Sequence, residues 1–176
     1  MMTQTIRRSA PRGVVRSVRA ALLAERLEQG ADLLIALAES TTDAEWRRPV
    51  SRTDPRTVGT VVHHVATKYA LEIDLALKLA FETPLPPVTM EHVHMLNAEH
   101  AASHPDPGKV EAIELLRRNS RTAAEAIRAL RDEELDRAQQ AKLYFDAPVT
   151  CQFLLEDHAV RHSYRHLAGI RAALKR

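Results

Sequence analysis

Apolar residues recur at intervals of three and four along most of the chain, which is the spacing of helices that bury one face. This spacing predicts a first helix over about Val14–Glu39 and a second over about Thr57–Glu82. It continues in a shorter piece over about Met90–His104, and two further long stretches follow. Because runs of β-branched residues are few, the pattern predicts an all-α protein.

Local signals mark the ends of the two later helices. Asp106 is placed to cap the third long helix, with Pro107 at its first position. The last helix is expected to start near Pro148 and to reach the C-terminus. Between these helices, the segment Asp132–Asp146 is predicted to be a polar connection.

Four long helices of roughly 20 to 28 residues make a four-helix bundle the simplest architecture. The piece Met90–His104 then forms a short extra helix in the connection between helix 2 and helix 3. Residues 1–13 are rich in arginine and contain Pro11 and Gly13, so we expect a flexible N-terminal arm there. Residues 14–176 are expected to form a single bundle domain.

Composition narrows the classes of function. The 25 Lys and Arg residues nearly balance the 23 Asp and Glu residues, so a nucleic-acid partner is not expected. No stretch has the length and apolarity of a membrane span or a secretion signal, and we therefore expect a cytoplasmic protein without a membrane partner. The single cysteine, Cys151, rules out an internal disulfide and is expected in the core.

The histidines are placed as in a metal site. His158, His162 and His166 recur every four residues in the last predicted helix, while His63 and His64 lie in the second. Two imidazoles at positions i and i+4 can hold one ion, and a third from another helix leaves a fourth position open, as in catalytic sites. Spacing alone does not choose between the pairs 158/162 and 162/166, and it favours His64 over His63 only slightly.

The other histidines and Asn97 are predicted to have roles other than binding the metal ion. A solvated face is expected from the histidines in or beside the middle helix, which are His92, His94, His100 and His104. His63 is expected to pack or to meet solvent, and His158 to support another group by a hydrogen bond. Asn97 and His100 are predicted to reach the open side of the ion and to contact substrate. Motifs of serine hydrolases, nucleotide-binding proteins and zincins are missing from the sequence.

Two segments resemble signatures of the DinB-like superfamily. In Thr57–Ala66 a small residue is followed five positions later by His64, as in the second helix of that superfamily. In His162–Ile170 two histidines separated by three residues precede a short run that ends in Ile, similar to its last helix. Trp46 and the segment Asn97–Glu99 also resemble features common in such proteins.

The resemblance covers the chain from about Val15 to Arg176 and implies a four-helix bundle with an uncommon chain order. It implies a three-histidine site for a divalent metal ion formed by His64, His162 and His166. Zinc or nickel is the expected ion, and iron(II) also accepts imidazole. Members often dimerise, and some are hydrolases while others are transferases or isomerases that depend on low-molecular-weight thiols. The resemblance therefore implies a homodimeric, metal-dependent enzyme with a small-molecule substrate.

Two other hypotheses remain open at the level of sequence. The bundle could bind metal or another ligand without turnover, as a stress-related sensor or interaction module, or it could be a structural dimer whose histidines fill the core. An ion in the three-histidine site would lower the pKa of bound water toward about 7, or hold a thiol as thiolate. Because imidazole binds metal only when deprotonated, we expect release of the ion as pH falls through roughly 6 to 5.

Overall fold

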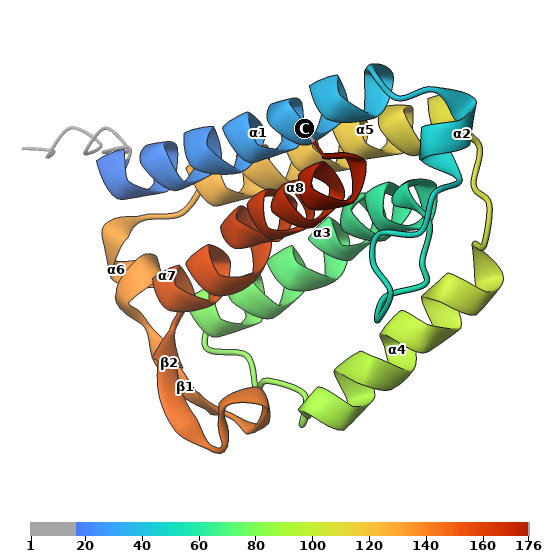
Figure 1. Cartoon of the computed structure of the whole chain (residues 1–176). Coiled ribbons are helices and arrows are strands. Elements are labelled where there is room, and N and C mark those ends of the chain that lie inside the picture. The colour runs from blue at the N-terminus through green and yellow to red at the C-terminus, as the bar shows by residue number, and fades with distance from the viewer. Residues whose placement is uncertain (1–16, 176) are drawn as a thin grey trace, which may run out of the picture.

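The computed structural model describes residues 17–175, so the predicted N-terminal arm lies outside the described residues. Four long helical segments form a bundle, which confirms the predicted all-α fold (Figure 1). They are α1 (Val18–Glu39), α3 (Val58–Ala80), α5 (Lys109–Arg128) and a last segment that consists of α7 (Cys151–Leu154), η2 (Leu155–Val160) and α8 (Arg161–Leu174). In this part of the chain, no helix combines the length and apolarity needed to cross a membrane.

The order of the helices around the bundle differs from their order along the chain. α5 packs against both α1 and α3, and the last helical segment packs against the same two helices from the other side (Figure 1). α1 and α3 therefore face each other diagonally, although only the short helix α2 (Asp43–Trp46) separates them in sequence. Because α3 and α8 are neighbours, side chains about a hundred residues apart can meet inside the bundle.

The core is aliphatic and continuous across the four helices. Its largest fully buried side chains come from α1, α3, α5 and the last helical segment, and they include Leu27, Leu34, Tyr69, Leu79, Leu116, Ile127, Leu155 and Ile170. Burial of each such side chain contributes about 1.5–3 kcal/mol relative to exposure, which makes these helices the rigid frame of the molecule. Cys151 is fully buried and donates its thiol to the carbonyl of Ala76, as a core residue does.

Trp46 links three parts of the fold at the beginning of α3. The turn that carries it is closed by a capping box in which Thr42 and Glu45 bond to each other's backbone amides. Its indole Nε1 donates to the carbonyl of Pro107 at 2.9 Å. A Cβ atom on Gly59 would lie 2.5 Å from Cε2 of Trp46, so only glycine lets the indole pack this closely on α3.

The extra helix α4 (Met90–Ser103) lies outside the bundle, in the predicted connection (Figure 1). None of its residues is buried, so it has no apolar face packed into the core. Its C-terminal end is held by Thr60, whose Oγ1 donates to the carbonyl oxygens of His104 and Pro105 at 3.0 and 3.1 Å. α4 is therefore fastened to α3 by polar contacts.

Two predicted boundaries are wrong. α5 begins at Lys109 with Gly108 as its N-cap, whereas Asp106 pairs with Arg47 instead of capping the helix. Pro148 does not start the last helix, because it belongs to a strand. That strand, β2 (Ala147–Thr150), pairs antiparallel with β1 (Ala138–Ala141).

The predicted polar connection is thus more structured than expected. It contains the short helix α6 (Asp132–Asp136), then β1 and the 3₁₀ turn η1 (Lys142–Tyr144) that leads toward β2. Phe145 and Asp146 both adopt positive φ, which reverses the chain between the strands. Strands of four residues with one buried position each leave too short an alternation to be recognised from sequence.

The last helical segment is not a regular α-helix. Leu155–Val160 forms the π-helical segment η2, in which hydrogen bonds run from i to i+5. The rotation of 100° per residue that holds in a regular α-helix therefore does not hold between residues 155 and 160. The wider turn changes the direction of His158 relative to His162 and His166, which both lie in the regular helix α8.

Candidate metal centre

Three predicted residues meet between α3 and α8. Each of His64, His162 and His166 offers a ring nitrogen, and these atoms all lie within 4.8 Å of one another. The Nε2 atoms of His64 and His162 are 3.2 Å apart. The ring of His64 is inclined by 70° to that of His162 and by 78° to that of His166. We call these residues the buried group.

This geometry suits a shared ion. Imidazole nitrogens bind zinc at about 2.0–2.1 Å, so two ligands of one tetrahedral ion lie roughly 3.3 Å apart. The separation of 3.2 Å between His64 and His162 is close to that value. Crossed rings also allow the lone pairs to point at a common centre. The residues present therefore fit a divalent ion.

Glu72 on α3 supports the buried group. His162 Nδ1–H donates to Glu72 Oε1 at 2.5 Å, and the two side chains are only 12% and 10% exposed. This bond fixes the tautomer of His162, so that its Nε2 lone pair faces His64. Sequence reasoning missed Glu72, although an acid between Leu71 and Ile73 in an apolar run was an available signal.

Burial disfavours the protonated form of His64 and His166 in this group. It is the largest cause that lowers the pKa of His166 to about 3, and it lowers the pKa of His64 still further, with His162 the next cause for both. Neutral imidazole is the form that binds metal. Among the described residues, His64 Nδ1 and Glu72 Oε2 are buried without a hydrogen-bond partner, which is costly unless another group satisfies them.

A cavity of about 430 Å³ opens beside the buried group, within the range of small-molecule sites. His64, His162, His166 and Glu72 line it together. The apolar part of its wall comes from α3, α4, the segment before α4 and the hairpin, and comprises Leu71, Leu75, Val88, Met90, Val93, Leu96 and Leu143. Asn97, predicted to contact substrate, also lines this cavity.

Basic side chains outnumber acidic ones in the rest of the wall. Arg56, Lys68, Arg161 and Arg165 line the cavity, and besides Glu72 the only lining acid is Asp157. Arg56 pairs with Asp54, and Arg161 pairs with Asp157. Neither Lys68 nor Arg165 forms a close ion pair within residues 17–175, and burial lowers the pKa of Lys68. The cavity therefore favours a ligand with negative charge.

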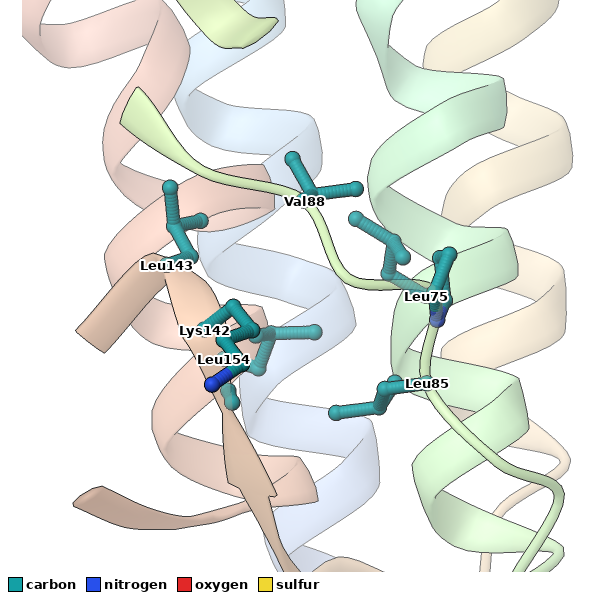
Figure 2. Close-up of a pocket in the computed structure, with 8 residues that line it drawn as sticks. Leu75, Leu85, Val88, Lys142, Leu143 and Leu154 are labelled. Carbon is teal, nitrogen blue, oxygen red and sulfur yellow. The ribbon is translucent and has the colours of Figure 1, made fainter. Parts of the chain in front are cut away.

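A second, much smaller hollow of about 20 Å³ adjoins the apolar end of the cavity. Figure 2 shows Leu85 and Val88, from the segment between α3 and α4, opposite Leu143 of the hairpin. Leu75, Val88 and Leu143 line both spaces. This hollow has room for about one water molecule, so it is a packing gap and not a second ligand site.

His158 lies outside the buried group but lines the cavity. Its Nε2 is 2.9 Å from the hydroxyl oxygen of Tyr144, which donates its own proton to Asp157 Oδ2 at 2.7 Å. His158 Nε2–H must therefore donate to Tyr144. The expected supporting role of His158 thus involves Tyr144, and the structure brings the pair 162/166, not 158/162, to His64.

The other predicted surface histidines do not behave alike. His94 is exposed. His92 takes part in the capping box of α4, where its side chain accepts a hydrogen bond from the backbone amide of the N-cap Thr89. His100, predicted to contact substrate, does not line the cavity but lies with His63 and His104 in a second three-histidine cluster. His100 and His104 are partly buried and so do not belong to the solvated face that the sequence suggested, whereas His92 and His94 are exposed as predicted.

A four-helix bundle in which α3 and the last helix each contribute histidines to one pocket defines a class of candidate metalloproteins. Residues 26–170 match the family model of the DinB superfamily, and the chain belongs to this superfamily. The match spans both histidine segments that carry the resemblance in the sequence.

The fold is shared with a solved structure. That structure is YfiT from Bacillus subtilis, described as "a probable metal-dependent hydrolase with an unusual four-helix bundle topology". The two chains superpose with a TM-score of 0.72 at 19% sequence identity, and the match covers 97% of this chain and 94% of the other. At this identity the comparison shows the fold and not the reaction. A comparison with curated protein sequences gave no match.

Proposed function

We propose that this protein is a metal-dependent enzyme that acts on a small molecule, either by hydrolysis or with a low-molecular-weight thiol. His64, His162 and His166 would hold the divalent ion, with zinc or nickel expected first and iron(II) also suited. The observation that carries this proposal is the convergence of three imidazoles on one wall of a cavity of about 430 Å³. The DinB family membership and the description of YfiT support the same class of function.

A divalent ion bound there supplies a Lewis acid that lowers the pKa of water or of a thiol. The protein's own groups orient this chemistry. Glu72 holds the Nδ1 proton of His162 and thereby keeps its Nε2 available as a ligand. Burial raises the pKa of Tyr144, so its hydroxyl stays protonated and continues to bridge Asp157 and His158 at the cavity wall.

The cavity wall suggests the class of substrate. Among residues 17–175, Lys68 and Arg165 form no close ion pair, while the wall from α4 and the hairpin is apolar. A small molecule with a carboxylate or similar anionic group and an apolar portion would use both features. Asn97 can donate or accept a hydrogen bond to its polar part.

Metal analysis of protein purified without an affinity tag tests the metal. We expect at least one equivalent of a divalent ion per chain, and loss of activity toward simple esters, amides or thiol adducts after chelation. Activity should return when the ion is restored. Metal far below one equivalent would refute the metal site, and stoichiometric metal without turnover in these screens would favour the alternative of a non-catalytic binder.

A substitution tests the anionic substrate. Lys68→Met keeps the length and apolar stem of the side chain but removes its charge. We expect kcat/KM for an anionic ester to fall about 10-fold, which corresponds to one partly buried charge contact, while a neutral ester of the same shape is unaffected. Arg52, exposed and outside the cavity wall, supplies the matched control Arg52→Met. Equal effects on both esters would contradict the role of Lys68.

A further inference from the structure

Three histidines that the proposed function does not use form a second cluster. His63 lies on α3, His100 lies on α4, and His104 is the C-cap of α4. Each offers a ring nitrogen, and these atoms lie within 4.8 Å of one another. His63 Nδ1 and His100 Nε2 are 2.9 Å apart. We call these residues the α4 group.

The rings of the α4 group are stacked. The ring centroids of His63 and His104 are 4.3 Å apart and those of His100 and His104 are 4.8 Å apart, with interplanar angles of 27° and 21°. α4 itself buries no residue, so its two histidines are not held against α3 by a fully buried apolar face of their helix. Among the described residues, His100 Nδ1 is buried without a hydrogen-bond partner, which marks a polar atom whose ligand is still to be assigned.

Helix spacing and one hydrogen bond from α3 place the three side chains together. His100 and His104 are four residues apart on α4, the spacing at which two imidazoles can share an ion. Thr60, three residues before His63 on α3, donates to the carbonyl of His104. The separation of 2.9 Å between His63 and His100 needs to widen only to roughly 3.3 Å to admit a zinc ion.

We propose that His63, His100 and His104 form a second binding site for a divalent metal ion, distinct from the buried group. Three imidazoles select an ion of the zinc, nickel, cobalt or copper type over magnesium or calcium. Binding requires at least one of the stacked rings to turn about its χ2 torsion, which is a broad and soft coordinate for histidine. The half-exposed position of the group leaves room for water in the remaining coordination positions.

The site would have a consequence for the cavity. α4 supplies Met90, Val93, Leu96 and Asn97 to the cavity wall, and polar contacts of Thr60 and His63 hold its C-terminal end against α3. An ion shared between His63 of α3 and two histidines of α4 would join the two helices directly. Metal binding at the α4 group would therefore restrain one wall of the substrate cavity.

Titration of the metal-stripped, untagged full chain with cobalt(II) or zinc tests this proposal. We expect the wild-type protein to bind two equivalents, and His104→Gln to bind one. In His104→Gln the remaining ion should be bound by the buried group. His162→Ala should also bind one equivalent, held by the α4 group, and the double variant should bind none. His94→Ala, which changes an exposed histidine on the same helix, should still bind two. Circular dichroism checks that each variant folds.

This design can refute either proposed metal site without refuting the other. If the wild type binds one equivalent, and this is lost in His162→Ala but kept in His104→Gln, the α4 group is not a metal site while the buried group stands. If the single equivalent is instead lost in His104→Gln and kept in His162→Ala, the α4 group stands and the proposed function loses its metal. Hydrogen exchange gives a second readout, because protection of α4 amides should rise with metal in wild type but not in His104→Gln.

Discussion

The two histidine groups have the same composition but different environments. They share α3, where the adjacent residues His63 and His64 belong one to each group. In the buried group the ring of His64 crosses its partners at 70° and 78°, and Glu72 bonds to His162. In the α4 group the rings stack within 27° of parallel, and no carboxylate of residues 17–175 is hydrogen-bonded to them.

This difference shows how a group of histidines can be preorganised for metal binding. Crossed rings and a carboxylate behind one of them fix lone pairs toward a common point before any ion arrives, which lowers the cost of binding. Stacked rings must first reorient, so part of the binding free energy is spent on that change. We therefore expect the buried group to bind more tightly than the α4 group, although both contain three imidazoles.

Removal of a ligand from the buried group should have the largest effect. We expect His162→Ala to weaken binding at this group by more than about 100-fold, because loss of a supporting partner alone costs 10- to 100-fold. Competition with a chromophoric chelator measures the change. His158→Ala is the matched control, since His158 lies one turn earlier and lines the cavity without joining the group. Equal losses in both variants would contradict the assignment of ligands.

Glu72→Gln should weaken the same site less, by about 10- to 100-fold, because the amide keeps the shape but no longer stabilises the Nδ1–H of His162. Binding at the α4 group should not change. Asp74→Asn provides the control on the same helix, since Asp74 is exposed and pairs with Lys78. An unchanged affinity in Glu72→Gln would show that the carboxylate does not prepare the buried group.

A third substitution tests what the two groups share. Gly59→Ala forces a Cβ to 2.5 Å from Trp46 at the start of α3, and overpacking of this kind costs about 1–3 kcal/mol of stability. Gly169→Ala is the control, because its Cβ would lie at an ordinary 3.7 Å from Val50. Urea unfolding should therefore show a loss for the first and a small gain for the second. Stability unchanged in Gly59→Ala would mean that Trp46 can move aside.

The pH dependence of the metal-free protein gives a further test of how the two groups are buried. The pKa of His166 falls from 6.5 to about 3 on folding, chiefly through burial, and that of His100 falls to about 4. As pH falls below about 6.5, these two histidines take up protons in the unfolded chain but stay neutral in the folded chain until pH approaches their lowered pKa values. The free energy of unfolding should therefore decrease as pH falls from about 6.5. Urea unfolding at several pH values measures the slope, and His166→Gln should make it shallower. An identical slope in the variant would contradict the burial of His166.

The pattern of apolar residues was sufficient to predict the helices, because each long helix buries one continuous stripe. The hairpin was missed, since its strands have four residues and one buried side chain each. The start of α5 was misplaced because Asp106 has the side chain of a cap but bonds to Arg47. Local composition cannot reveal such a competition between partners that are distant in sequence.

The site was predicted in part, and the reason lies in the kind of information each residue carries. His64, His162 and His166 were identified from spacing and family resemblance, and the structure brings them together. Glu72 and the α4 group depend on how α3 is rotated against its neighbours, which periodicity does not specify. The assignment of ligands itself stays a prediction until metal is measured.

The π-helical segment η2 has a consequence for how this pocket tolerates insertions and deletions. A π-turn houses more residues per revolution than an α-turn, and η2 directly precedes the helix that bears His162 and His166. Deleting one residue between Leu155 and Val160 would return this turn to α-helical hydrogen bonding and leave the downstream helix in phase, because the wider turn is what accommodates the extra residue. His162 and His166 would then still face α3, whereas a deletion within the regular helix α8 would turn the residues that follow it by about 100°.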